Sequence, residues 1–212
     1  METVQLISEY LQKGNAKKVA EVTKFAIDSG IAPKVILDDG LLKGMAVIGE
    51  KFKQHEIFIP DVILAARAMY AGLDLLKPLL AREGVQSMGK IVIGTIQGDL
   101  HDIGKNLVAM MLKGSGFDVI DLGNDVPPQK FIDAAEKEHA DIIGMSALLT
   151  TTMPKMKDVV ELAKARQLYG KVKIIVGGAP LSLEFAKEIG ADAYGYDAVN
   201  AVECAKKFLG KN

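Results

Sequence analysis

From residue 90 to the end of the chain, short β-rich runs alternate with helical segments, and this alternation constrains the fold more than any other feature. The runs lack the in–out alternation of a half-exposed strand, as expected when helices cover both faces of a sheet. Five strands alternating with five helices predict an α/β fold with a doubly wound, Rossmann-like (flavodoxin-like) five-stranded parallel sheet. The predicted strands are 90–96, 117–121, 140–146, 171–177 and 191–195, and the predicted helices lie near 103–113, 127–138, 154–168, 181–189 and 198–209.

Residues 1–83 show helical periodicity only. Gly14 ends a first helix, and Asn15 is a suitable N-cap for a second. Pro33 suits the first turn of a third helix, and a largely apolar fourth helix follows Pro60. We therefore predict an N-terminal four-helix bundle. Three glycines in the third helix favour a close approach to another helix or to a ligand: Gly40, Gly44 and Gly49.

A short polar stretch flanked by glycines separates the two regions, so we predict a helical domain over 1–83, a linker over 84–89 and an α/β domain over 90–212. Lys and Arg total 26 against 27 Asp and Glu, which leaves no basic excess for nucleic acid. The single cysteine, Cys204, cannot form an internal disulfide. No apolar run approaches the ~18 residues of a membrane span, and the N-terminus is unlike a secretory signal. We expect a cytoplasmic protein without membrane or nucleic-acid partners.

The first predicted strand is followed directly by a loop that carries Asp99 and His101. In doubly wound sheets, ligands bind beyond the carboxyl ends of the strands, so this histidine lies in the ligand crevice. Asp99 is close enough to accept a hydrogen bond from one imidazole nitrogen and leave the other free for a metal. The alternative is that Asp99 caps the next helix and His101 is an ordinary polar loop residue.

Two more strand ends carry small or hydroxyl-bearing residues. The third strand ends at Ser146 in a loop that continues to Thr152, and either Thr151 or Thr152 is expected to cap the helix near Pro154. The fourth strand ends in paired glycines, which permit either a ligand close to the backbone or a sharp turn. This pair is Gly177 and Gly178, followed by Ala179.

Together these residues resemble the motif of the cobalamin-binding domain family, which reads Asp-x-His-x-x-Gly, then Ser-x-Leu, then Gly-Gly. The three pieces occur in order, each after a predicted strand, with 41 residues between Gly104 and Ser146 and 28 between Leu148 and Gly177. Residues 1–83 resemble the helical cap of methionine synthase and of corrinoid proteins in multi-component methyltransferase systems. The runs that carry this second resemblance are 49–52, 57–60 and 64–69.

The resemblance implies a cobalamin (corrinoid) cofactor bound base-off/His-on, with His101 as the ligand of cobalt. Asp99 would tune the imidazole of His101, and these two are the implied catalytic residues. Ser146, supported by Thr150, would hydrogen-bond the buried lower base. Met69, with Ala65 and Ala66 on the same helix, would face the upper side of the corrin; the alternative is that these residues only pack the bundle. Small residues would line a slot for the nucleotide tail: Gly94, Gly98, Gly144, Gly177 and Gly178. The cofactor-binding residues implied are Gly98, Asp99, Leu100, His101, Asp102, Ile103, Gly104, Ser146, Leu148, Thr150, Gly177, Gly178, Ala179 and Met69.

The function implied is a methyl carrier that alternates between Co(I) and methyl-Co(III) and is not a complete enzyme alone. Its implied partners are a substrate-specific methyltransferase of barrel fold, a second methyltransferase acting on a pterin or thiol, and a reductive activase. One alternative is the small subunit of an adenosylcobalamin-dependent mutase, which would lack a helical cap. Another is a cobalamin-responsive sensor, which would need a DNA-binding module, yet 1–83 hold 11 Lys/Arg and 11 Asp/Glu.

Overall fold

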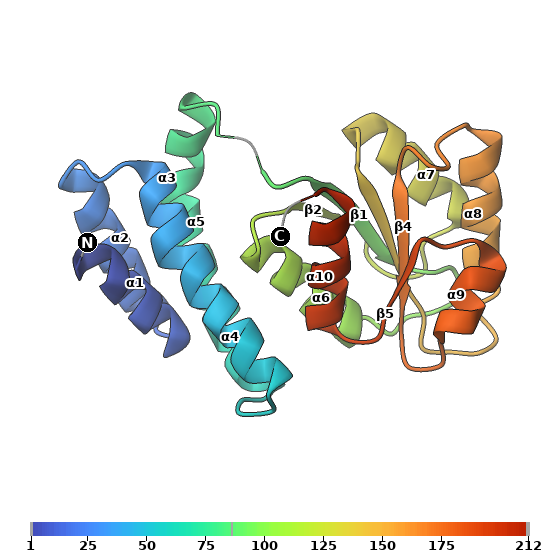
Figure 1. Ribbon diagram of the computed structural model, residues 1–212, viewed down its shortest axis with the longest axis horizontal. Helices are drawn as coiled ribbons and strands as arrows, with labels where there is room; N and C mark the ends of the chain where they lie inside the picture. The colour runs from blue at the N-terminus through green and yellow to red at the C-terminus, as the bar shows by residue number, and fades with distance from the viewer. Residues whose placement is uncertain (1, 86, 211–212) are drawn as a thin grey trace. The chain divides into compact units, whose positions relative to one another are not determined.

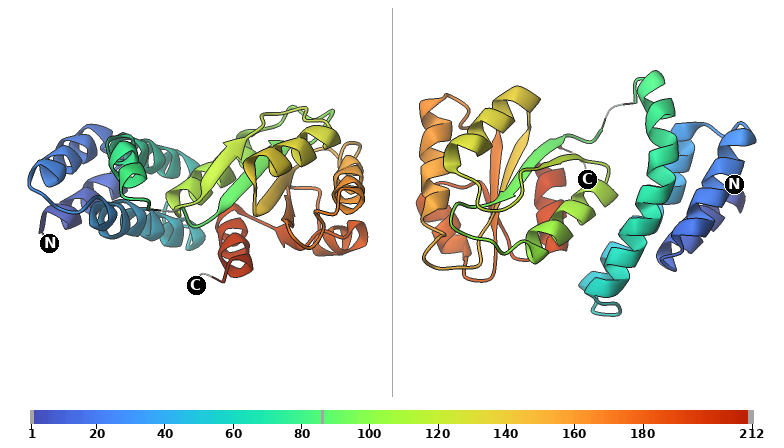
Figure 2. Two further views of the ribbon diagram at one scale, coloured as in Figure 1. Left: turned by 90° about the horizontal axis from the view of Figure 1, so that it is seen from above. Right: turned by 180° about the vertical axis from the view of Figure 1, so that it is seen from behind.

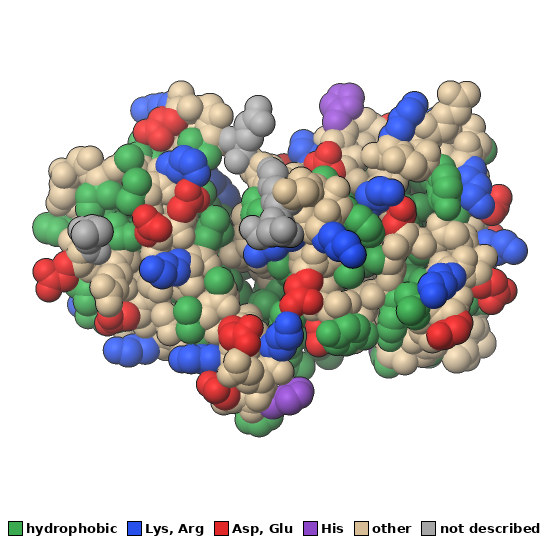
Figure 3. Space-filling view, viewed as in Figure 1, with side chains coloured by type: hydrophobic (Ala, Val, Ile, Leu, Met, Phe, Trp, Pro, Cys, Tyr) green, Lys and Arg blue, Asp and Glu red, His purple; other side chains and the backbone are tan. Residues whose placement is uncertain are grey.

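The computed structural model describes residues 2–85 and 87–210. The chain divides into two compact units, Met1–Gln86 with Gly114–Gly116, and Ser87–Lys113 with Phe117–Asn212 (Figure 1). This division is based on contacts within each unit, and the predicted domain boundaries, 1–83, 84–89 and 90–212, remain predictions. No helix of the described ranges has the length and apolar character needed to cross a membrane. Basic and acidic side chains are interspersed over the visible face of both units (Figure 3).

The N-terminal unit is the predicted helical bundle. The Asn15 side chain accepts a hydrogen bond from the Lys18 backbone N–H at 3.1 Å, which confirms Asn15 as an N-cap. Pro33 opens the third helical stretch, as predicted. The helical elements of this unit are α1 (Glu2–Gln12), α2 (Ala16–Asp28), α3 (Pro33–Val35), the π-helical η1 (Ile36–Leu42), α4 (Lys43–Lys53) and α5 (Ile59–Arg82).

The third helical stretch runs without a break through α3, η1 and α4, but its middle is π-helical where the sequence predicts an ordinary helix. A Cβ at Gly40 would lie 3.3 Å from the Ile7 side chain, and one at Gly44 would lie 3.1 Å from the Ser8 Cα. These two glycines therefore allow α1 to approach closely, as predicted. A π-helical turn inside a longer helix also changes the register of the side chains that follow it.

The second unit is the predicted α/β fold, with a five-stranded parallel sheet in the order β2-β1-β3-β4-β5. One buried core joins α7, α8 and α9 to one face of the sheet, and α6 and α10 cover the other face (Figures 1 and 2). The strands are β1 (Lys90–Thr95), β2 (Asp118–Asp121), β3 (Ile142–Ser146), β4 (Lys173–Gly177) and β5 (Ala193–Gly195). The helices are α6 (Ile103–Gly114), α7 (Pro128–Glu138), α8 (Lys155–Ala165), α9 (Leu183–Ile189) and α10 (Ala198–Phe208).

The strand order reverses at β1, because β2 lies on one side of β1 and β3 on the other. Loops that follow neighbouring strands at such a point diverge and leave a crevice at the carboxyl edge of the sheet. Thr95 pairs with Ser146 at the last register position, so the loops after β1 and β3 start side by side. This switch point is where the sequence places the loop of Asp99 and His101.

Candidate functional site

Asp99 joins the loops after β1 and β3. Its side chain is fully buried, and Oδ2 accepts hydrogen bonds from the backbone N–H groups of Leu148 at 2.7 Å and Leu149 at 3.1 Å. The Thr152 hydroxyl lies 3.0 Å from the same oxygen. These donors come from a loop 49 to 53 residues further along the chain. One carboxylate therefore fixes the two loops of the switch point to each other.

The other carboxylate oxygen of Asp99 holds His101. Oδ1 lies 2.7 Å from Nδ1 of the imidazole and accepts the His101 backbone N–H at 3.0 Å. The buried Thr95 hydroxyl donates to the His101 carbonyl at 3.0 Å, so the backbone of the histidine is held from both sides. The His101 side chain is nevertheless 52% exposed. The pairing predicted from the Asp-x-His spacing is confirmed.

Burial of Asp99 on its own raises the pKa of the carboxyl. The hydrogen bonds from the backbone N–H groups of His101, Leu148 and Leu149 and from the His101 side chain outweigh burial and hold the pKa of Asp99 well below its usual range. Asp99 is therefore ionised, and an ionised carboxylate only accepts hydrogen bonds. It follows that Nδ1 of neutral His101 carries the proton and Nε2 carries the free lone pair.

His101 has no cluster of further metal-binding side chains around it among the described residues. Within 2–85 and 87–210, no group of three or more His, Cys, Asp or Glu side chains could hold a metal. A carboxylate on Nδ1 is the usual partner of a metal-binding histidine, because it fixes the tautomer and raises the basicity of Nε2. The arrangement therefore fits a metal that arrives with its other ligands in a cofactor, and does not fit a metal held by protein alone.

Apolar side chains near His101 are left uncovered by the protein's own core. Leu100 is 68% exposed and Ile103 is 76% exposed, on either side of the histidine in the chain. Leu148 and Leu149, whose backbones bind Asp99, are also exposed. An imidazole nitrogen among exposed leucine and isoleucine side chains suits a broad, partly apolar ligand.

Other predicted site residues lie along the same edge of the sheet. Ser146 is half-buried at the end of β3, and its hydroxyl makes no hydrogen bond to another described residue. Thr150 is exposed in the loop that follows. Asp102 is half-buried, and its carbonyl accepts the Asn106 N–H at 2.7 Å as α6 begins. Ala179 is exposed just beyond β4.

The motif glycines differ in whether the surrounding protein leaves room for a larger side chain. Gly178 has a φ of +132°, and a Cβ there would overlap the Ala147 carbonyl oxygen, so the loop backbone itself requires glycine. A Cβ at Gly177 would lie 3.0 Å from the Gly195 carbonyl oxygen. By contrast, a Cβ at Gly104 would have no atom within 4 Å. Packing within the protein therefore explains Gly177 and Gly178 but leaves open space at Gly104, beside the histidine loop.

Two glycines assigned to the slot are packed against the protein's own core. A Cβ at Gly94 would lie 2.9 Å from the Phe131 ring, and one at Gly144 would lie 3.2 Å from the Ile93 side chain. Both glycines are buried in strands of the sheet. Their small size serves the packing of α7 and of neighbouring strands, so close packing accounts for them without a ligand.

Sequence reasoning assigned one threonine wrongly and missed another. Neither Thr151 nor Thr152 caps α8, because the N-cap residue of α8 is Pro154 and the helix has no side-chain cap. The Thr152 hydroxyl instead lies 3.0 Å from Oδ2 of Asp99 and 3.0 Å from the Leu149 carbonyl oxygen. Thr95, the missed residue, ends β1 and binds the His101 carbonyl. A hydroxyl-bearing residue at the end of a buried strand was the available signal for Thr95.

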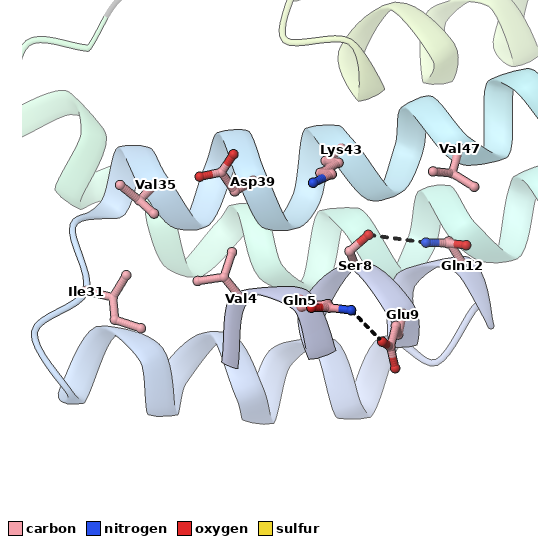
Figure 4. Close-up of a pocket in the computed structure, with 10 residues that line it drawn as sticks. All are labelled: Val4, Gln5, Ser8, Glu9, Gln12, Ile31, Val35, Asp39, Lys43 and Val47. Carbon is pink, nitrogen blue, oxygen red and sulfur yellow. Dashed lines mark hydrogen bonds between the residues drawn. The ribbon is translucent and has the colours of Figure 1, made fainter. Parts of the chain in front are cut away.

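The helical unit holds a groove of ≈ 680 Å³ between α1 and the stretch formed by η1 and α4 (Figure 4). None of the predicted site residues lines this groove. Met69, predicted to face the corrin, is 1% exposed in α5, and its neighbours Ala65 and Ala66 are buried as well. This burial agrees with the alternative that these residues pack the bundle, and the assignment of Met69 to the corrin stays a prediction.

Family models and relatives agree on what the chain resembles. Two models, each described as a B12 binding domain, match residues 89–203 and 4–77. A corrinoid protein of Desulfitobacterium hafniense is 43% identical, and the match covers 100% of this chain and 99% of the relative. Dimethylamine corrinoid protein 1 of Methanosarcina acetivorans is 46% identical over 84% of each chain.

Solved structures give the same result. The methanol:cobalamin methyltransferase complex MtaBC from Methanosarcina barkeri contains a chain that is 31% identical and superposes with a TM-score of 0.89. That match covers 100% of this chain and 81% of the other. The family models and the relatives together establish the family. The chain belongs to the corrinoid proteins that carry a B12-binding domain.

Proposed function

We propose that this protein is the methyl carrier of a multi-component methyltransferase system and binds its corrinoid base-off, with Nε2 of His101 on cobalt. One observation carries the proposal: ionised Asp99 lies 2.7 Å from Nδ1 of His101 and thereby leaves the lone pair of Nε2 free on an exposed imidazole. The corrinoid, when bound, supplies the cobalt that accepts and gives up the methyl group. A neutral imidazole is a suitable ligand for such a metal.

The chain's own residues bind and orient the cofactor. Asp99 keeps the imidazole in one tautomer and one orientation. Ser146 binds the displaced lower base in this proposal, with Thr150 in support, and its hydroxyl makes no hydrogen bond to another described residue that would compete with that role. Exposed Leu100 and Ile103 offer apolar surface to the corrin. Roles in cofactor binding for the remaining motif residues are part of this proposal: Gly98, Asp102, Gly104, Leu148, Gly177, Gly178 and Ala179.

The partners proposed are a substrate-specific methyltransferase, an acceptor methyltransferase acting on a pterin or thiol, and a reductive activase. Relatives named for dimethylamine and a structure of a methanol:cobalamin methyltransferase complex support the first of these. A barrel fold for the first partner and the need for an activase are expectations from the family resemblance. The helical unit, matched by its own B12-binding model over residues 4–77, favours a carrier over a mutase subunit or a sensor.

The test of the ligand is electron paramagnetic resonance of cobalamin-loaded, gel-filtered protein reduced to Co(II). In the wild type, labelling histidine with ¹⁵N should change the nitrogen splitting of the cobalt signal from a triplet to a doublet. His101→Ala should lose this response. His139→Asn is the matched control, because His139 has a φ of 52°, which asparagine tolerates. If the splitting in the wild type does not change with the label, His101 is not the ligand of cobalt.

The test of the carrier role follows on the same sample. After strong reduction and addition of methyl iodide, the absorption spectrum should change to that of the methylated cofactor while the cofactor stays on the protein. Stable binding of adenosylcobalamin without any response to methyl iodide would refute the carrier and favour a mutase subunit or a sensor.

A further inference from the structure

The segment that follows β2 binds the start of the His101 loop. The Gly98 backbone N–H donates to Asp125 Oδ1 at 2.7 Å, and the Asp125 N–H donates to the Asp99 carbonyl at 3.0 Å. The Asn124 side chain donates to the Leu100 carbonyl at 3.3 Å. Three consecutive residues of the histidine loop are therefore each bonded to Asn124 or Asp125. These bonds act on the backbone just before His101.

The end of β2 also binds the far end of the loop, through Lys105. The Lys105 side chain is 2% exposed, and Nζ donates to Asp121 Oδ1 at 2.6 Å and to Asn106 Oδ1 at 2.7 Å. Lys105 lies in the first turn of α6, where the helix dipole disfavours a cation. Helix stability therefore does not explain a lysine here, whereas its ion pair ties the start of α6 to the end of β2.

The backbone of Asp125 supports a specific role for its side chain. Its φ is 51°, in the left-handed region that side chains other than Asn, Asp and Gly seldom adopt. This conformation brings a short carboxylate back to the Gly98 N–H, and it persists because the hydrogen bonds around it hold it. Asparagine keeps both the conformation and the acceptor, glycine keeps only the conformation, and alanine keeps neither.

The histidine loop has little else to hold it in place on its outer side. Leu100 and Ile103 are exposed, so their side chains add no core packing. Asp99 and Thr95 hold His101 from the inside, and the segment 121–125 holds both ends of the loop from the β2 side. A metal ligand must be held to within ~0.5 Å by such supporting bonds to be effective.

We propose that Asp125 and Asp121 are positioning residues, which fix the two ends of the loop 98–105 so that His101 presents Nε2 in one place. Asp125 acts through Gly98 and Asp99, and Asp121 acts through Lys105. This inference rests on the proposed function, because it takes His101 to be the ligand. Neither aspartate belongs to the Asp-x-His-x-x-Gly, Ser-x-Leu or Gly-Gly motif.

The test is the series Asp125→Asn, Asp125→Gly and Asp125→Ala, read out in two ways. In the apo-protein, amide hydrogen exchange reports whether the Gly98 N–H is held. In the cobalamin-loaded protein reduced to Co(II), the ¹⁵N-histidine splitting reports the fraction of cobalt bound to His101. Asp125→Asn keeps an uncharged acceptor and should lie closest to the wild type in both. Asp125→Gly and Asp125→Ala should speed Gly98 exchange by about ten- to a hundredfold, the loss expected for a hydrogen bond to a charged acceptor, and lower the histidine-bound fraction.

The glycine variant separates positioning from strain, because it relieves the backbone while removing the acceptor. If Asp125→Gly keeps both the wild-type exchange rate at Gly98 and the wild-type splitting, the inference is wrong. Fast exchange with an unchanged splitting would also overturn it, because the loop would then be loosened without effect on the ligand. If wild-type protein shows no histidine splitting at all, the proposed function fails instead, and the two failures remain distinct.

Discussion

Replacing Asp99 by asparagine should invert the tautomer of His101 while leaving the fold intact. The new amide nitrogen must face either the Oδ2 side, where it meets the N–H groups of Leu148 and Leu149, or the Oδ1 side, where it meets His101. Backbone N–H groups cannot become acceptors, but an imidazole can move its proton. The amide should therefore face His101, so that Nδ1 accepts and Nε2 carries the proton.

The cost in stability follows from the same hydrogen bonds. In Asp99→Asn, one backbone donor, the His101 N–H, loses its acceptor and faces an amide N–H₂. An unmatched buried donor costs about 1–3 kcal/mol, so the free energy of unfolding should fall by about that amount. Asp99→Ala strips the acceptor from three backbone donors, those of His101, Leu148 and Leu149, and should cost roughly three times as much.

Two measurements on the apo-protein check this reasoning. Urea unfolding gives the free energies of the wild type and both variants. Nitrogen-15 NMR distinguishes a protonated from an unprotonated ring nitrogen, at about pH 8.5, two units above an ordinary histidine pKa. The His101 signals are assigned by comparison with His101→Ala. If Nδ1 of His101 still carries the proton in Asp99→Asn, or if Asp99→Asn and Asp99→Ala are equally stable, the argument from donors and acceptors fails.

Three further outcomes are expected. Gly178→Ala should lower the free energy of unfolding by at least about 3 kcal/mol, because its Cβ would overlap the Ala147 carbonyl oxygen. Gly104→Ala should change it by less than about 1 kcal/mol, and similar losses for the two variants in urea unfolding would contradict this. Asp121→Asn leaves the buried Lys105 ammonium without a counter-charge and should lower the free energy of unfolding by about 3–5 kcal/mol. Lys105→Met should cost less, because the carboxylate it leaves unpaired is 31% exposed to water, and a larger loss for Lys105→Met would refute this. Burial raises the pKa of the Cys204 thiol, so at about pH 8 it should react with iodoacetamide more slowly than glutathione does, and an equal rate would count against it.

The fold could be predicted because it depends on patterns that are local in the sequence. Alternating β-rich and helical segments placed each strand within about two residues of its observed bounds. The bond between Asp99 and His101 was also predictable, since the two residues are neighbours in one turn. The π-helical η1 was not, because the sequence there has the same apolar spacing as an ordinary helix.

Contacts between loops far apart in the sequence could not be predicted. Thr151 or Thr152 was expected from the neighbouring residues to cap a helix, but the Thr152 hydroxyl lies next to Asp99, which approaches it only because β1 pairs with β3. The bonds of Asp121 to Lys105 and of Asp125 to Gly98 likewise depend on β2 lying beside β1. Periodicity identifies the elements, but only the strand order decides which loop ends meet.

The dependence of Asp99 on donors from Leu148 to Thr152 also sets an order of assembly. Until β3 pairs with β1, the carboxylate lacks the N–H groups that compensate its burial, so it remains in water and His101 has no fixed partner. A nascent chain must therefore complete β1, α6, β2, α7 and β3 before its imidazole is oriented. The side chain of His101 is therefore oriented only after β3 has paired with β1, although His101 lies near the beginning of the domain.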